Sequence, residues 1–212
     1  MLSKVIYPEE NTVVEVNEDA QFVVLFKDYL DEKHYNLELV FNKQGVKAEL
    51  LTLYVLPNNA KLFLTTVTTH KVPNTTCNTI VRGVLNTYSE SYYTGKIIIK
   101  KEAQQTSSFL SDRVLVIGNG TKNNSEPILE IEADDVSASH GASTGKIDKN
   151  DLYYLRTRGL SEKEATGLII EGFFNKVLAT ISDPEVRELA GTTVNAANSF
   201  KVNTLGAEMV KS

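Results

Sequence analysis

Short apolar segments separated by polar corners make up the first two thirds of the chain. The segment 61–69 alternates apolar residues with threonine, a pattern typical of a β-strand with one buried face. No convincing amphipathic helix begins before about residue 149. The pattern therefore predicts a β-rich body, with strands at 12–16, 22–26, 36–41, 48–56, 61–69, 80–86, 95–100 and 113–117.

Several of these strands end in a similar corner, in which polar residues follow the strand and a small residue follows them. The examples are Val14–Val16 before Ala20, Leu39–Phe41 before Gly45, and Ile97–Ile99 before Ala103. Ile131 begins a related, slightly longer corner that reaches Val136. Recurrence of this kind suits the stacked coils of a β-solenoid, and a β-sandwich with similarly spaced turns is the alternative.

The last third of the chain changes to a helical pattern. Asp148 is a good N-cap for a first helix that Gly159 ends, and Ser161 to Glu164 form a capping box for a second. Asp183 before Pro184 predicts the start of a short third helix. The apolar stripe expected on the second helix is Leu168, Ile169, Phe173, Val177 and Leu178.

These patterns divide the chain into three parts. Residues 1–148 form the β core, residues 149–190 the C-terminal helices, and residues 191–212 a tail or arm. The tail is polar and rich in small residues, and a final strand around Phe200 and Val202 is an alternative. A chain of 212 residues is long enough to bury one core without disulfides.

Composition and charge narrow the function classes. Cys77 is the single cysteine, which excludes an intramolecular disulfide and a metal site built from several cysteines of one chain. The net charge of −5 argues against a nucleic-acid or anionic-membrane surface. The sequence has neither a signal-peptide pattern nor a run of about 18 apolar residues, so we expect a cytoplasmic protein without a membrane span.

His140 is the ionisable side chain with the most unusual surroundings. It lies in a predicted loop of small residues, and Asp134, Asp135 and Asp148 are near it in sequence. An exposed imidazole near carboxylates could bind a borderline metal or relay protons near neutral pH. The alternative is a histidine that hydrogen-bonds to the loop backbone.

Three other groups of residues indicate a function less specifically. Glu130 and Glu132 share one strand face, as glycoside cleavage would need, but a solvated strand face has the same pattern. Cys77 is either a half-buried structural thiol or, with His70, a sulfur-accepting or metal-binding group. The helix pair around Gly159 has the order of a helix-turn-helix, but its basic residues are offset by acids, which favours a tertiary helix pair or a protein-docking surface.

Several of these pieces resemble, in order, the core domain of the SufB/SufD family of iron–sulfur cluster assembly proteins, SufD more than SufB. The similarity covers roughly residues 70–180. The matching segments are 70–76 (HKVPNTT), 81–85 (VRGVL), 93–97 (YTGKI), 103–106 (AQQT), 127–131 (PILEI), 133–136 (ADDV), 139–142 (SHGA), 145–148 (GKID) and 152–160 (LYYLRTRGL).

The resemblance implies a right-handed parallel β-helix followed by helices, and a non-enzymatic scaffold that works beside an ABC-type ATPase, SufC. In the family the C-terminal helices dock the ATPase, and two subunits pair through their β-helices. It also implies a cluster-assembly role for His140 near the subunit interface, with Asp134 and Asp135 orienting its loop, and only a transient cluster. By position, the docking surface would draw on Leu152, Tyr153, Arg156, Gly159, Phe173 and Phe174.

The chain also departs from the family pattern. Ala138 stands where D-type members often have a cysteine, Asp112 is near the place of the B-type cysteine that receives sulfur, and Gly141 replaces a B-type glutamate. Family members are usually about twice as long. We therefore expect a short D-like subunit that forms a homodimer or heterodimer, and a purely structural β-helix module without metal chemistry is the alternative.

Overall fold

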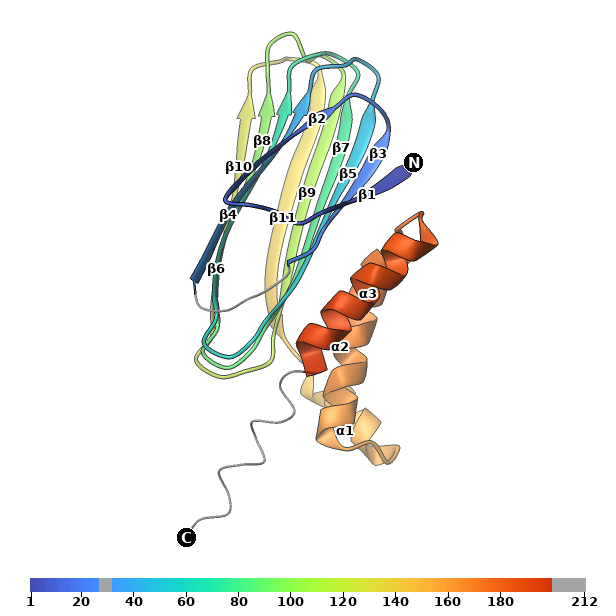
Figure 1. Cartoon of the computed structure of the whole chain (residues 1–212). Coiled ribbons are helices and arrows are strands. Elements are labelled where there is room, and N and C mark those ends of the chain that lie inside the picture. The colour runs from blue at the N-terminus through green and yellow to red at the C-terminus, as the bar shows by residue number, and fades with distance from the viewer. Residues whose placement is uncertain (27–31, 200–212) are drawn as a thin grey trace.

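The computed structural model describes residues 1–26 and 32–199. Figure 1 shows a tall stack of strands with the helical segment along one side of it. The strands are β1 (Leu2–Ile6), β2 (Asn11–Val16), β3 (Ala20–Val24), β4 (Glu32–Phe41), β5 (Lys47–Leu56), β6 (Lys61–His70), β7 (Thr76–Leu85), β8 (Glu90–Ile99), β9 (Thr106–Val116), β10 (Lys122–Ile131) and β11 (Val136–Lys146).

The strands alternate between two parallel sheets. Odd-numbered strands form sheet A in the order β1-β3-β5-β7-β9-β11, and even-numbered strands form sheet B in the order β10-β8-β6-β4-β2. Each consecutive pair of strands therefore makes one coil, and every coil pairs with the next in parallel register. This topology is a β-solenoid, so the sandwich alternative is wrong and the predicted parallel β-helix is confirmed.

The predicted corners fall at the same place in successive coils. Val16, Phe41, Ile99 and Ile131 belong to one column of register partners at the end of sheet B. His70 occupies the same column between Phe41 and Ile99. Because each coil repeats this corner, an apolar side chain at its start is buried against the coils on either side, as for Phe41 and Ile99.

The solenoid interior is built from columns of inward-facing residues in sheet A. One column contains only small residues: Ala20, Ala48, Cys77, Ser108 and Ala138. The next contains Phe22, Leu50, Thr79, Leu110 and His140, and the third contains Val24, Thr52, Val81, Asp112 and Ala142. Most of these residues are buried in one continuous apolar cluster, and the polar members gather toward the C-terminal coils.

The helices are α1 (Lys149–Thr157), α2 (Glu162–Leu178) and α3 (Pro184–Ser199). Their predicted boundaries are confirmed at the caps. The Asp148 carboxylate accepts from the Asn150 N–H, Ser161 and Glu164 form the capping box, and Gly159 follows α1 with a φ of 94°. Asp183 accepts from the backbone N–H of Glu185 at the start of α3.

Helices α2 and α3 pack on the outer face of sheet A. Their apolar side chains form a second core with Val23, Leu51 and Leu53 of the sheet. Buried Gln21 links the two parts, because its amide donates to the Thr180 carbonyl at 2.9 Å and its carbonyl accepts from the Ser182 N–H at 3.1 Å. Helix α1 has no buried residue and extends beyond this packed pair.

Three expectations about local structure need correction. The predicted loop around His140 is strand β11, which keeps full parallel pairing with β9 despite its Gly, Ala and Ser residues. Helix α3 continues past residue 190 to Ser199. The buried face of α2 is Ala165, Ile170, Phe174, Val177 and Leu178, whereas Leu168 is exposed. The possible strand around Phe200 lies outside the described residues.

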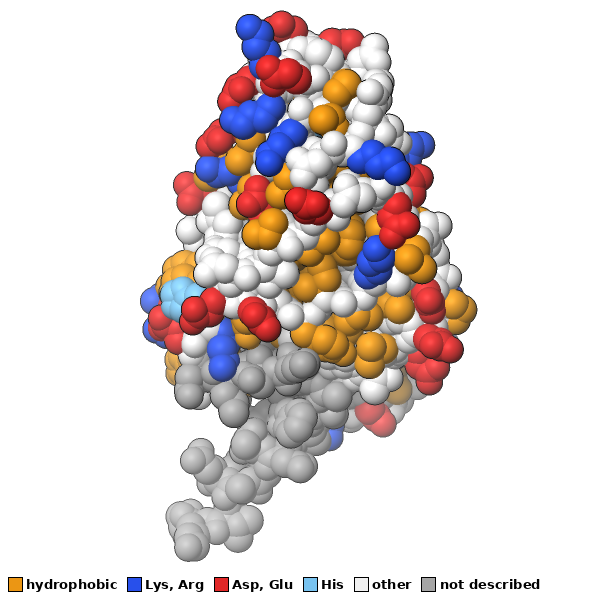
Figure 2. Space-filling view, turned by 45° about the horizontal axis from the view of Figure 1, so that its top comes forward, with side chains coloured by type: hydrophobic (Ala, Val, Ile, Leu, Met, Phe, Trp, Pro, Cys, Tyr) orange, Lys and Arg blue, Asp and Glu red, His pale blue; other side chains and the backbone are white. Residues whose placement is uncertain are grey.

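The outer face of sheet B is held by ion pairs between coils. Lys96 reaches Glu130 at 2.8 Å and Lys100 reaches Glu132 at 2.6 Å, each across neighbouring strands. The face shown in Figure 2 intersperses basic and acidic side chains, without an extended basic field of the kind that nucleic acid selects. Among the described helices, none is long and apolar enough to cross a membrane.

Candidate functional site

The C-terminal coil leaves one end of the solenoid open. We define this open end as β10 and β11, the last strands of sheets B and A, each of which pairs with only one neighbouring strand within residues 1–26 and 32–199. Most residues of β11 are exposed, and Ile131 of β10 is 43% exposed although its column partner Ile99 is fully buried. The open end therefore presents unpaired strand edges and apolar surface, both of which favour contact with another chain.

His140 lies in the middle of this open end. Its register partner in β9 is Leu110, whose side chain is buried in the interior. His140 thus stands on the inward face of sheet A, yet it is exposed because no further coil covers it. Sequence reasoning found the residue but not this orientation, which depends on strand register.

The acids near His140 in sequence are not near it in space. Asp134 and Asp135 occupy the exposed corner before β11, where the Asp135 carbonyl accepts from the Gln105 N–H at 2.6 Å. A strand rises about 3.3 Å per residue, so roughly 16 Å of β11 separates Asp135 from His140. Within residues 1–26 and 32–199, no three His, Cys, Asp or Glu side chains gather as a metal site. His140 therefore belongs to no such group within these residues.

A shallow hollow of about 390 Å³ crosses β7, β9 and β11 on the outer face of sheet A, whereas the His140 side chain stands on the inward face. Phe109, which is 40% exposed, and Ile80 give it an apolar part, and a Cβ added to Gly141 would meet nothing within 4 Å. The hollow is lined by Asn78, Thr79, Ile80, Phe109, Leu110, Ser111, Ser139, His140 and Gly141.

Asp112 is a buried carboxylate that sequence reasoning did not select as a site. It is 1% exposed, faces the interior from β9, and neither carboxylate oxygen has a hydrogen-bond partner among the residues that the structure describes. Burial raises its pKa to about 6, while the nearby Ser125 hydroxyl and the Arg82 charge lower it less. Ser125 is close enough to act on the carboxylate but does not reach hydrogen-bond geometry.

His70 and Cys77 belong to the interior and not to an exposed site. His70 contacts Thr75 at 2.8 Å and Ser108 at 3.1 Å through its two ring nitrogens, and its ring stacks on Phe41. Burial lowers the pKa of His70 to about 4. Burial likewise raises the pKa of Cys77 to about 12, so the thiol stays protonated and unreactive as a nucleophile near neutral pH.

The buried His70 predicts a specific pH dependence. The folded protein holds the imidazole neutral, whereas the unfolded chain takes up a proton below pH 6.5. The contribution of His70 is therefore complete above pH 6.5 and decreases by about 3 kcal/mol as the pH falls to 4. As the pH falls, protonation of Asp112 changes the free energy of unfolding in the opposite direction. The measurement is therefore the difference in urea stability between wild type and His70→Gln at each pH, in which the contribution of Asp112 cancels. A difference that stays constant from pH 7 to pH 4 would contradict the assignment.

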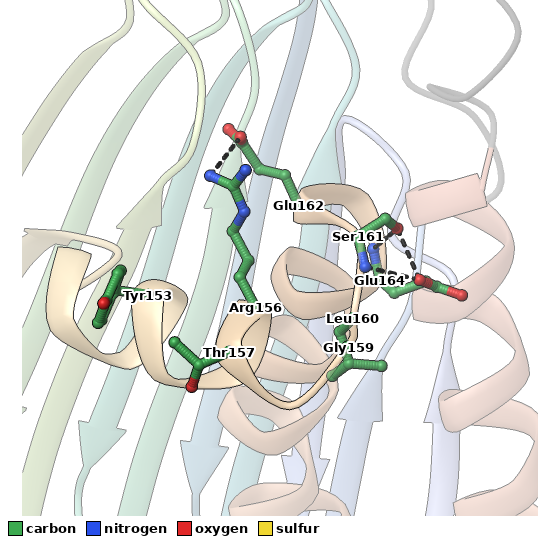
Figure 3. Close-up of a pocket in the computed structure, with 8 residues that line it drawn as sticks. All are labelled: Tyr153, Arg156, Thr157, Gly159, Leu160, Ser161, Glu162 and Glu164. Carbon is green, nitrogen blue, oxygen red and sulfur yellow. Dashed lines mark hydrogen bonds and ion pairs between the residues drawn. The ribbon is translucent and has the colours of Figure 1, made fainter.

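A second exposed site lies where α1 meets α2. A hollow of about 780 Å³ lies at this turn, and Figure 3 shows the residues that line it. Arg156 reaches Glu162 across it at 3.4 Å, and Tyr153 is 71% exposed. The lining residues are Tyr153, Arg156, Thr157, Gly159, Leu160, Ser161, Glu162 and Glu164.

The six residues predicted for ATPase docking differ in their exposure. Tyr153, Arg156 and Gly159 line the hollow, and Leu152 is half-buried on α1. Phe174 is 1% exposed in the core between α2 and sheet A, and Phe173 packs partly against the same core. Phe174 is therefore unavailable for docking in this arrangement, whereas Tyr154, which the sequence analysis did not select, is 57% exposed. The pattern of α2 could not separate Phe173 from Phe174, because apolar residues surround much of that helix.

The fold defines a parallel β-helix protein with a helical C-terminal segment. A family model described as the SufBD core domain of the SUF system for FeS cluster assembly matches residues 6–173. The chain belongs to this SufBD family.

Named relatives agree with the family model. The chain is 35% identical over 156 residues to an iron–sulfur cluster assembly SufBD family protein of Mycobacterium leprae, and 35% identical over 152 residues to one of Mycobacterium tuberculosis (strain H37Rv). It is 28% identical over 147 residues to one of Synechocystis. These alignments cover 70%, 68% and 69% of this chain, but only 40%, 38% and 32% of the relatives.

Proposed function

We propose that the chain is a non-enzymatic scaffold subunit of a SUF-type iron–sulfur cluster assembly complex. The observation that carries this proposal is the open end, where unpaired strand edges, exposed Ile131 and His140 lie together on the last coil. A second SufB/SufD-type subunit, identical or different, would continue the sheets at these edges. Pairing in this way would bury the edges, which otherwise favour unspecific association.

The helical segment would dock a SufC-type ATPase. Helices α2 and α3 are fixed to the solenoid by their own core, whereas α1 has no buried residue and presents Tyr153 and Arg156. Exposed tyrosine and arginine are the residue types that contribute most to protein interfaces. Because only the short segment Ile147–Asp148 separates β11 from α1, a movement of α1 would act directly on the strand that carries His140.

His140 would serve the cluster from this interface. An imidazole is an accepted ligand of iron, and Ala138 stands two residues before His140, so in this proposal the partner subunit supplies the thiolate. The cluster would therefore be a transient cargo held between chains.

His140→Ala is expected to lower the yield of assembled cluster at least tenfold while leaving folding and ATPase binding unchanged, because the side chain is exposed and has no structural partner in the described residues. The measurement is iron and sulfide bound after anaerobic co-expression with the partner subunits. His34→Ala is the matched control, since His34 is also exposed but lies on the outer face of sheet B against Phe63. An unchanged cluster yield in His140→Ala would leave the purely structural module as the better account.

A further inference from the structure

Four buried oxygen atoms without hydrogen-bond partners lie behind the open end. They are the two carboxylate oxygens of Asp112, the Asn123 side-chain oxygen and the Ser125 hydroxyl. Buried polar atoms in folded proteins are nearly always paired, so several unpaired oxygens in one region need an explanation. A buried carboxylate without a partner is the most costly of these groups.

The fold brings the three residues together. The Asn123 amide donates to the Thr144 hydroxyl at 2.7 Å, which fixes β10 opposite β11. Because the chain reverses between these strands, Ser125 lies opposite Ala142, and Ala142 is the register partner of Asp112. The effect of the Ser125 hydroxyl on Asp112 shows the same proximity. Asp112 and Ser125 therefore face the interior between the last two coils, and Asn123 stands two residues before Ser125 on the same face of β10.

The charge of Asp112 has no direct counterpart in the described residues. Arg82 acts on it through space, but its guanidinium donates to the carbonyl oxygens of Val81 at 2.8 Å and Ser111 at 3.3 Å. The Asn123 amide nitrogen is already engaged with Thr144. The atoms that remain are oxygen ligands, and such sets prefer hard divalent cations over the softer metals that thiolates bind.

We propose that Asp112, Ser125 and the Asn123 side-chain oxygen bind one partly hydrated divalent cation of the Mg²⁺ or Mn²⁺ class between the last two coils. The cation neutralises the buried carboxylate and satisfies the unpaired oxygens. It enters from the open end, where the residue above Asp112 is the small side chain of Ala142. The site is separate from His140, which belongs to the neighbouring interior column.

The test uses Mn²⁺ alone on the purified full chain, without ATPase or partner subunit, so its outcome does not depend on the proposed function. Electron paramagnetic resonance counts bound Mn²⁺, and thermal unfolding follows the shift in Tm. We expect one bound Mn²⁺ per chain and a higher Tm on its addition. Asp112→Asn should weaken binding at least tenfold and abolish the shift, while Ser125→Ala should weaken binding several-fold.

Two control variants distinguish Mn²⁺ binding at this site from unspecific Mn²⁺ binding to other charged or metal-binding side chains. Glu126→Gln removes a carboxylate from the residue next to Ser125, but on the exposed face of the same strand, and should leave Mn²⁺ binding unchanged. His140→Ala should also leave it unchanged. The proposal is overturned if wild type binds no Mn²⁺, or if Asp112→Asn binds it as tightly as wild type does.

Discussion

Gly83→Ala is expected to reduce the free energy of unfolding by about 3 kcal/mol, because the solenoid interior has no space for an added methyl group there. A Cβ on Gly83 would overlap the ring of Tyr54, its register partner in the preceding coil. The Tyr54 ring is fully buried and its hydroxyl contacts the Ser91 hydroxyl at 3.0 Å, so it cannot move without breaking that contact. Chemical denaturation measures the loss.

Gly141→Ala is the matched control for this prediction. Gly141 also belongs to a strand of sheet A, but a Cβ at this position would meet nothing within 4 Å. Gly141→Ala should change the free energy of unfolding by no more than about 0.5 kcal/mol. Alanine restricts the conformations of the unfolded chain, which offsets part of any loss. Equal stabilities of Gly83→Ala and Gly141→Ala would show that the coils are not stacked in this register.

Replacing Tyr153 with alanine and Arg156 with glutamate together is expected to weaken binding to the cognate SufC-type ATPase at least 100-fold. Loss of two central interface residues of these types commonly costs more than 2 kcal/mol, and the reversed charge adds repulsion. Helix α1 buries none of its residues, so the variant should fold and melt like wild type. Equilibrium binding to the immobilised ATPase measures the effect.

Tyr88→Ala serves as the control for that variant. Tyr88 is 62% exposed, but it lies in the turn between β7 and β8 and is not part of the helical segment. It should bind the ATPase like wild type. If the α1 variant also retains full affinity, the docking surface lies elsewhere, and the exposed hollow between α1 and α2 has another role.

The repeated corners made much of this fold predictable. Val16, Phe41 and Ile99 end strands in the same column, and the caps at Asp148 and Ser161 set helix boundaries because their side chains bond locally. Local chemistry of this kind is present in the sequence itself. Local chemistry could not predict strand β11, because its Gly, Ala and Ser residues favour a loop. This segment is a strand only because its backbone pairs with the edge of β9.

Prediction of the candidate site required the strand register more than the local chemistry of the sequence. His140 was identifiable as an unusual histidine, but its separation from Asp134 and Asp135 follows from the extended path of β11. Asp112 lies between half-buried Ser111 and exposed Arg113, so its burial is visible only once β9 is placed between β7 and β11. Phe173 and Phe174 are adjacent in the sequence, and only the packing of α2 on sheet A distinguishes the half-buried ring from the core ring.

The most direct test of the scaffold account is the mass and content of the particle formed when this chain and its cognate SufC-type ATPase are co-expressed. The complex would be purified without oxygen, measured by light scattering, and assayed for iron and sulfide. The account predicts a stable particle that contains the ATPase and at least two β-helix subunits. Recovery of this 23.5 kDa chain as a monomer without the ATPase would contradict both proposed interfaces.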